Sequence, residues 1–200
     1  MKRIIPIIIL LFCASLTSVL AQISNADREK ITNQLKASQT ELMSALKGLS
    51  EEQWLYKPTA DAWSIAECVE HIAISEENIF AIVGMSMQSE PEAGIKDKLK
   101  FDDNMIMGFI TSREEKVKTR PEFEPSQKFD GYKGSLKAFK DKRKSNLQYV
   151  KSTSDDLRNH YFEFPFGWVD SYQVIVFMSG HTQRHIAQIE EVKAASGYPL

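Results

Sequence analysis

Four histidines are the side chains whose type and spacing suggest chemistry in this chain: His71, His160, His181 and His185. His181 and His185 are four positions apart. On a helix this spacing places both rings on one face, with their Cβ atoms about 5–6 Å apart. Two imidazoles in this arrangement can bind one metal ion. A buried hydrogen-bonded pair and a surface pair on a rotated helix are the alternatives that the spacing leaves open.

The helix face that carries this pair is predicted to point into the protein. Val174, Met178 and Val192 continue the row of His181 and His185 at helical spacing. Neutral imidazoles inside an apolar core need hydrogen-bond partners, and a metal ion would satisfy both rings. A metal site is therefore one interpretation of the pair, and a buried hydrogen-bonded pair is the other.

His71 is the candidate for a third ligand, because it belongs to a different predicted helix. Small and polar residues share its side of that helix: Ser64, Cys68, Ser75 and Asn78. The spacing does not show that this side meets the histidine pair, and a lone histidine is more often structural than ligating. From the residues alone, both roles of His71 remain open.

The segments that carry these histidines have the clearest helix signals in the chain. Ser64 and Glu67 form a capping box that begins a helix over residues 65–87. Asp170 and Gln173 form a similar cap pair, and the helix that they begin is predicted to continue to Ala195. Two more long helices are predicted from hydrophobic periodicity over residues 24–47 and 132–152.

The rest of the chain is less regular. A helical turn with a capping box begins at Ser50, and a further helix is predicted over residues 102–119. Its inward residues are predicted to be Met105, Ile106, Phe109 and Val117. The basic stretch 137–144 is interpreted as a solvated helix face, and residues 159–167 as an aromatic loop.

Because no stretch shows the alternation of a strand, the predicted fold class is all-α. It is a bundle of four main helices, with a short helix and an irregular insertion between the second and third. The helix over residues 132–152 is expected to present Leu136, Phe139, Leu147 and Val150 to the core.

Composition excludes several classes of protein. The 200 residues are 42% hydrophobic and 26% charged, which is ordinary globular usage and unlike a disordered, collagen-like or polytopic membrane chain. The net charge of −2 lacks the basic footprint of a nucleic-acid-binding protein. Two cysteines are too few for a disulfide scaffold.

Residues 1–21 are interpreted as a secretory signal peptide. Lys2 and Arg3 precede an apolar run that is short for a bilayer span of about 20 residues, and Val19 and Ala21 suit a cleavage site. Residues 22–200 are then one mature domain, exported to the periplasm or the medium, with no stable membrane association. Cys13 leaves with the signal, so Cys68 is the one cysteine that remains.

Two segments of the sequence resemble the DinB-like superfamily: AWSIAECVEHI at residues 62–72 and HTQRHIAQI at residues 181–189. The likeness continues through residues 139–143 and 156–158, so it covers essentially the mature chain. The resemblance implies a four-helix bundle, often a homodimer, with a divalent metal ion held by three histidines. These map onto His71, His181 and His185. His160 has no counterpart in the pattern and is interpreted as a loop histidine.

Three neutral histidines leave a divalent ion with an open coordination position. Zinc there could lower the pKa of bound water to about 7, or a thiol could bind and be deprotonated. The resemblance implies the same two activities, metal-dependent hydrolysis and low-molecular-weight-thiol transfer. We expect an exported hydrolase of a small molecule, with thiol transfer as the alternative. A non-catalytic binding or stress module with a structural metal is the third hypothesis.

Zinc or nickel is the expected metal, although three imidazoles also suit copper or iron. Phosphate cofactors and a serine-hydrolase mechanism are unsupported, because the sequence has no glycine-rich phosphate loop and no serine elbow.

Four further side chains are candidates near the metal ligands. Gln188 could contact a substrate or the His185 ring, with surface solvation as the other interpretation. Glu67 could act as a general base, but its place in the capping box is preferred. Cys68 could be a fourth ligand, but a buried small residue is preferred. Trp63, like Trp168, is expected to pack against a helix start rather than line a pocket.

Overall fold

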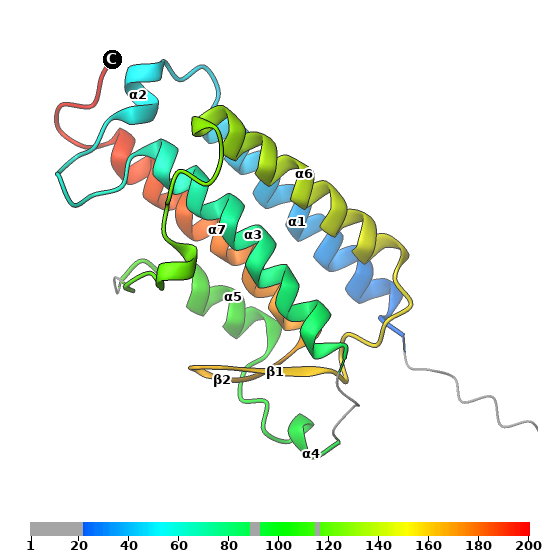
Figure 1. Cartoon of the computed structure of the whole chain (residues 1–200). Coiled ribbons are helices and arrows are strands. Elements are labelled where there is room, and N and C mark those ends of the chain that lie inside the picture. Colours follow the sequence, from blue (N-terminus) through cyan, green and yellow to red (C-terminus); the bar gives the residue numbers. More distant parts are fainter. Residues whose placement is uncertain (1–21, 89–92, 115–116) are drawn as a thin grey trace, which may run out of the picture.

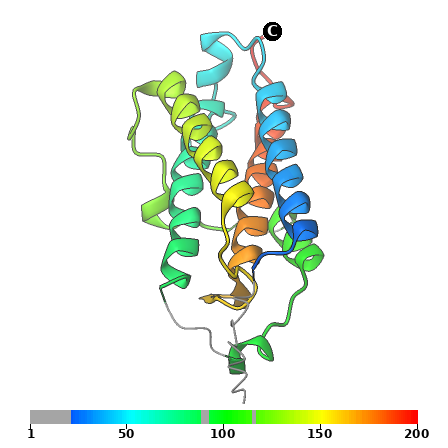
Figure 2. The same cartoon turned by 90° about the vertical axis from the view of Figure 1, so that its right-hand side faces the viewer.

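The computed structural model describes residues 22–88, 93–114 and 117–200. Four long helices pack side by side into a bundle (Figures 1 and 2), which confirms the predicted all-α four-helix fold. The predicted signal peptide, residues 1–21, lies outside the described residues. The four bundle helices are α1 (Asn25–Ala45), α3 (Ile65–Ser86), α6 (Gly131–Ser152) and α7 (Ser171–Lys193).

Side-chain caps define where the two histidine-bearing helices begin. Ser64 Oγ accepts a hydrogen bond from the Glu67 N–H at 3.2 Å, and Glu67 Oε2 accepts one from the Ser64 N–H at 2.7 Å. Asp170 and Gln173 form the same reciprocal pair at the start of α7. Both predicted capping boxes are present. Because each box satisfies two backbone donors that have no partner inside the helix, it fixes the residue at which the helix starts.

A buried arginine lies at the centre of the bundle, in the stretch that the sequence predicted to be solvated. The Arg143 side chain is fully buried, so that prediction is wrong for this residue. Its guanidinium forms a bidentate ion pair with Glu76 of α3, with Nε–Oε1 at 2.6 Å and Nη2–Oε2 at 2.8 Å. Asn146 donates a further hydrogen bond to Glu76.

The same guanidinium also reaches the other two bundle helices. Its Nη1 donates to the Leu35 carbonyl and to Ser38 Oγ of α1, at 2.7 and 2.8 Å. Its Nη2 donates to Thr182 Oγ1 of α7 at 3.0 Å. One side chain of α6 therefore hydrogen-bonds to all three partner helices. Because a buried guanidinium needs each of these acceptors, the network sets the relative positions of the four helices.

Apolar side chains surround this polar centre. Fully buried residues come from all four helices and include Leu35, Leu42, Ile72, Phe139 and Ile175. Leu136 and Leu147 of α6, which were expected to face the core, are only partly buried. The buried row of α6 instead runs through Phe139, Arg143, Asn146 and Val150.

Short helices lie before α3 and between α3 and α6 in the chain, and one of them packs beside α7 (Figure 1). Helix α5 packs against α7 through Ile106 and Ile110. The helix predicted over residues 102–119 ends at Thr111, and Val117 is exposed. Met105 and Phe109, predicted to face inward, are each about half exposed. The elements are α2 (Glu51–Leu55), α4 (Ala93–Lys96), α5 (Asp103–Thr111) and η1 (Pro121–Phe123).

Strands β1 (Tyr161–Phe164) and β2 (Gly167–Asp170) form an antiparallel hairpin where the sequence predicted an aromatic loop. The prediction failed because aromatic residues occupy both faces of β1, which conceals the alternation that identifies a strand. Gly167 has a φ of 133°, which favours glycine at this turn. His160 lies in the loop before β1, as predicted, but it is buried and its Nδ1–H donates to the Ser86 carbonyl.

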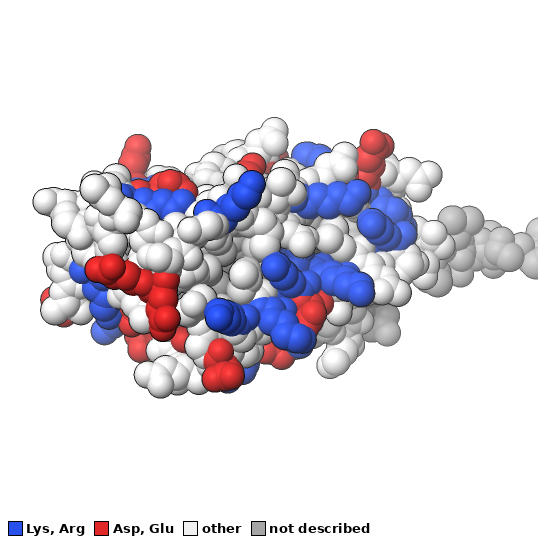
Figure 3. All heavy atoms as spheres, turned by 90° about the horizontal axis from the view of Figure 1, so that it is seen from above, with Lys and Arg blue, Asp and Glu red and all other residues white. Residues whose placement is uncertain are grey.

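Charged side chains are distributed over the outside of the bundle. Viewed from above, basic and acidic side chains are interspersed (Figure 3). Lys142 of α6 pairs with Glu77, and Lys137 pairs with Asp141 one turn along the same helix. The rest of the basic stretch is therefore a solvated face, as predicted. Among the described residues, no helix is both long and apolar enough to cross a bilayer.

Replacing Arg143 by methionine should destabilise the protein by about 3–5 kcal/mol, because it leaves the Glu76 carboxylate buried without its counter-ion. Replacing both partners, with Arg143→Met and Glu76→Leu, should recover most of that loss. Urea denaturation followed by circular dichroism measures both effects. A loss below about 1 kcal/mol in the single variant would show that the ion pair does not hold the bundle together.

Gly180 is a position at which side chains of α5 approach the backbone of α7 closely. A Cβ there would lie 2.3 Å from Ile110 Cγ2 and 2.9 Å from Met107 Sδ. Gly180→Ala should therefore displace α5 and lower the free energy of unfolding by about 1–3 kcal/mol. Gly84→Ala is the matched control, because a Cβ at Gly84 of α3 meets no atom within 4 Å. It should stabilise the protein by about 0.5–1 kcal/mol. Equal effects of the two substitutions would contradict this close approach.

Candidate metal centre

Three histidines from two helices converge on one point. His71 of α3 and the pair His181 and His185 of α7 lie with their Nε2 atoms facing one another. The His71–His181 and His185–His181 Nε2 separations are both 3.2 Å. All three potential ligand atoms lie within 4.8 Å of one another, and we call this group the histidine cluster. The fourth histidine, His160, is not part of it.

Hydrogen bonds at the opposite ring nitrogens orient two of these rings. His71 Nδ1–H donates to the Phe123 carbonyl at 2.7 Å, and His185 Nδ1–H donates to Gln188 Oε1 at 2.9 Å. A carbonyl oxygen can only accept, so both rings carry their proton on Nδ1. Both Nε2 atoms therefore point a lone pair into the cluster. His181 Nε2–H could donate to one of them at most, so the cluster cannot satisfy itself by hydrogen bonding alone.

The geometry and donor types of the cluster fit a metal ion. Two nitrogen ligands of a tetrahedral zinc ion, each about 2.0–2.1 Å from the metal, lie about 3.4 Å apart. The two 3.2 Å separations observed here are close to that value. Ligating histidines almost always donate their other ring N–H to a carbonyl or carboxylate, as His71 and His185 do. The histidine cluster is thus able to hold one divalent ion.

Burial keeps the three rings neutral. His71 and His185 are buried, whereas His181 retains part of its surface exposed. Desolvation lowers the pKa of His71, and it lowers the pKa values of His181 and His185 well below the usual value. The neighbouring rings also contribute, because each protonated imidazole would repel the next. Neutral imidazole is the form that binds metals.

Aromatic side chains flank the cluster on two sides. The Trp63 ring lies against His71, with centroids 4.9 Å apart, and near His185 at 6.2 Å. Trp63 was expected to pack against a helix start rather than line a pocket, and the structure adds that its ring also lies beside the cluster. On the other side, the Phe177 ring is stacked on His181, with ring centroids 6.2 Å apart. Phe177 also stacks on Phe164 of the β hairpin.

The other candidate side chains have separate partners. Gln188 contacts the His185 ring, which was one of its two predicted roles. Glu67 accepts from the Ser64 N–H and from Lys57 Nζ, so its carboxylate caps and stabilises the start of α3. Cys68 is fully buried, and burial raises the pKa of its thiol to about 12. The Cys68 sulfur therefore stays protonated, as expected of a buried small residue.

The segment before α6 supplies a contact that sequence reasoning did not find. The backbone carbonyl of Phe123 accepts the His71 Nδ1–H, and the neighbouring Glu122 carbonyl accepts from Asn78 Nδ2. Short η1 therefore lies along the His71 side of α3. A backbone acceptor in an irregular segment leaves no signature in the sequence, because any residue type can supply it.

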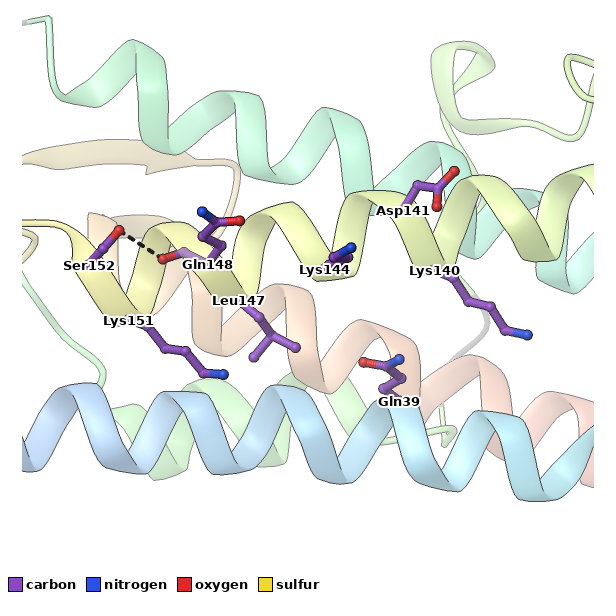
Figure 4. A pocket seen from close by; sticks show the side chains of 8 residues that line it. All are labelled: Gln39, Lys140, Asp141, Lys144, Leu147, Gln148, Lys151 and Ser152. Atoms are coloured by element: carbon purple, nitrogen blue, oxygen red, sulfur yellow. Dashed lines mark hydrogen bonds between the residues drawn. The ribbon is translucent and has the colours of Figure 1, made fainter.

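Two open grooves lie away from the histidine cluster. One, of about 610 Å³, runs between α1 and α6 and is lined by lysines of α6 and by Gln39 (Figure 4). The other, of about 840 Å³, lies between α2, the start of α3 and the start of α6, and Glu70 and Lys128 contribute to its walls. Neither groove contains a histidine of the cluster. Among the described residues, the cluster is the group of side chains able to hold a metal.

The histidine cluster and the bundle define the class of protein. The sequence model of the DinB superfamily matches residues 34–189. This chain therefore belongs to the DinB superfamily, as the resemblance in its two histidine-bearing segments implied.

The chain is also similar to individual proteins. The uncharacterized protein YuaE of Bacillus subtilis (strain 168) is 25% identical over 155 residues, which span 76% of this chain and 91% of YuaE. Among solved structures, YfiT from Bacillus subtilis is similar in fold, with a TM-score of 0.58. The alignment covers 88% of this chain and 91% of YfiT at 17% sequence identity. YfiT is described as "a probable metal-dependent hydrolase with an unusual four-helix bundle topology".

The lowered pKa values of the three rings should make the stability of the metal-free protein depend on pH. Unfolded histidines bind protons below about pH 6.5, whereas the folded rings resist protonation until a lower pH. Protons therefore favour the unfolded chain in this range. We expect the free energy of unfolding to be constant above about pH 7. Below about pH 6.5 it should fall by up to about 1.4 kcal/mol per pH unit for each ring.

Denaturant titrations of the metal-free protein between pH 7.5 and pH 5 measure this dependence. His181→Ala removes one of the rings, and it should make the decline with falling pH shallower. If the two proteins lost stability equally over this range, groups outside the cluster would account for the effect.

Proposed function

We propose that His71, His181 and His185 bind one divalent metal ion and that this centre hydrolyses a small molecule. The observation that supports the proposal best is the convergence of three Nε2 atoms, two of them fixed as lone-pair donors by hydrogen bonds at Nδ1. A donor set of this kind is expensive to bury without a ligand, because adjacent lone pairs repel each other.

A bound divalent ion would keep one coordination position open and lower the pKa of water there to about 7, which suits hydrolysis at neutral pH. The chain itself positions the donors. The Phe123 carbonyl and the Gln188 amide hold two rings in the required tautomer and orientation. The Trp63 ring packs against His71 and the Phe177 ring against His181, which places apolar surface beside the cluster.

An open site is favoured over a closed structural one. A structural zinc site has four protein ligands, whereas the cluster offers three. Cys68, the candidate for a fourth ligand, is buried, and its sulfur does not belong to the group of donor atoms that lie within 4.8 Å of one another. Glu67 is engaged in the cap of α3 and in its ion pair with Lys57. The description of the similarly folded YfiT as a probable metal-dependent hydrolase also supports this choice.

The proposal predicts about one metal ion per chain in the purified protein, or after reconstitution with zinc or nickel. His71→Ala and His181→Ala should each reduce metal binding at least about 10-fold while the far-ultraviolet circular dichroism is unchanged. His160→Gln is the matched control, because His160 is buried but lies outside the cluster. It should retain the metal. Elemental analysis after dialysis measures the metal content of the wild type and of the three variants.

Activity is tested next with the metal-loaded protein on small ester, amide and thioester substrates. We expect hydrolysis that is lost on chelation, restored by the metal, and absent in His181→Ala. Wild-type protein that binds neither zinc nor nickel would overturn the proposed centre. Metal binding with turnover that depends on an added thiol, and no hydrolysis, would replace the hydrolase by a thiol transferase.

A further inference from the structure

Ser75 of α3, one helical turn along from His71, is a buried hydroxyl to which the proposed function assigns no role. The residue is 1% exposed, and its Oγ has no hydrogen-bond partner among the described residues. We propose that Ser75 is a positioning residue of the metal centre: its Oγ hydrogen-bonds to the oxygen ligand that completes the coordination of the ion. This inference rests on the proposed function, because it requires a metal at the cluster.

Helix geometry places Ser75 on the cluster side of α3. Residues four apart lie on the same face, so Ser75 follows His71 one turn along. Helices α3 and α7 run antiparallel: Ser86 Oγ contacts Ser171 Oγ at one end, and His71 contacts His181 further along. Ser75 lies between these two contacts along α3. It is therefore at the height of the helical turn of α7 that precedes His181.

Segment η1 covers the same face from outside. His71 and Asn78 each donate a side-chain hydrogen bond to a carbonyl of η1, at Phe123 and Glu122. Ser75 lies between these two residues on α3, on the side of the helix that η1 contacts. This arrangement explains why Ser75 is buried although its helix face is small and polar. The Ser75 hydroxyl is thus on the His71 face of α3 and away from bulk water.

The missing partner distinguishes Ser75 from other buried serines. Ser38, Ser86 and Ser135 each donate to a backbone carbonyl three or four residues earlier in their own helix. Ser75 makes no such bond to the His71 carbonyl. Buried hydroxyls without a partner are rare, because the loss of hydration is not compensated.

Three other buried side-chain atoms among the described residues also lack a partner: Thr32 Oγ1, Gln34 Oε1 and Tyr198 OH. They lie on α1 and near the carboxyl terminus, on elements that carry no residue of the cluster. Of these four atoms, only Ser75 Oγ shares a helix face with a cluster histidine. Because a hydroxyl both donates and accepts, it suits an oxygen ligand such as water or an oxygen atom of the substrate.

Cobalt(II) provides a test that does not depend on activity, because its visible absorption reports the coordination of the ion. Ser75→Ala should weaken cobalt binding about 10-fold, as expected for loss of a hydrogen bond to a ligand of the metal. It should also raise the pH at which the cobalt spectrum changes as the bound water ionises, since the hydroxyl stabilises the ionised form by donation. Thr32→Val is the matched control: it removes a second unpartnered hydroxyl on a helix outside the site, and should leave both properties unchanged.

The metal-free proteins provide an independent readout. Because neither hydroxyl has a partner within the chain, Ser75→Ala and Thr32→Val should both unfold at the wild-type denaturant concentration or slightly above it. A clear loss of stability in metal-free Ser75→Ala would overturn the inference, since it would reveal a partner for Oγ inside the protein.

The cobalt outcomes separate this inference from the proposed function. If wild type binds cobalt and Ser75→Ala gives the same affinity, spectrum and pH profile, Ser75 has no role at the centre and the metal site stands. If wild type binds no cobalt, zinc or nickel, both proposals fail. Weaker binding together with a shifted pH profile in Ser75→Ala alone supports the positioning role.

Discussion

The buried ion pair between Arg143 and Glu76 is the interaction on which the rest of the bundle depends. Arg143 hydrogen-bonds to α1, α3 and α7 from its place on α6, so one guanidinium joins the four helices. Such a group is expensive to bury, and its cost is offset only when every acceptor is in place. Apolar packing tolerates small shifts of one helix along another, whereas this network does not. It therefore selects one register of α3 against α7.

That register brings His71 level with the pair on α7. Thr182, which accepts from Arg143, is the residue after His181, so the network fixes the rotation of α7 at the cluster itself. The capping boxes fix where α3 and α7 begin, and η1 holds the His71 ring through the Phe123 carbonyl. The histidine cluster is thus assembled by long-range contacts, while the tautomer of each oriented ring is set by a single local acceptor.

Local features of this protein could be predicted from the residues alone, whereas the long-range meeting of His71 with His181 and His185 was implied only by the family resemblance. Caps such as Ser64–Glu67 and the four-residue spacing of His181 and His185 are encoded by neighbours in the chain. Arg143 occupies a helical row with Phe139 and Val150, so its burial was detectable in principle. The presence of Glu76 opposite it depends on how two distant helices pack. The β hairpin and the Phe123 carbonyl were missed for a similar reason, since neither produces a periodic pattern.

The central claim is that three converging imidazoles form a metal centre, and diffraction from crystals of the metal-loaded protein tests it most directly. Data collected on either side of the absorption edge of zinc or nickel locate the ion without assumptions about its ligands. We expect one anomalous peak per chain, within coordination distance of Nε2 of His71, His181 and His185. A fully loaded crystal with no peak at that point, or with the ion bound elsewhere on the chain, would contradict it.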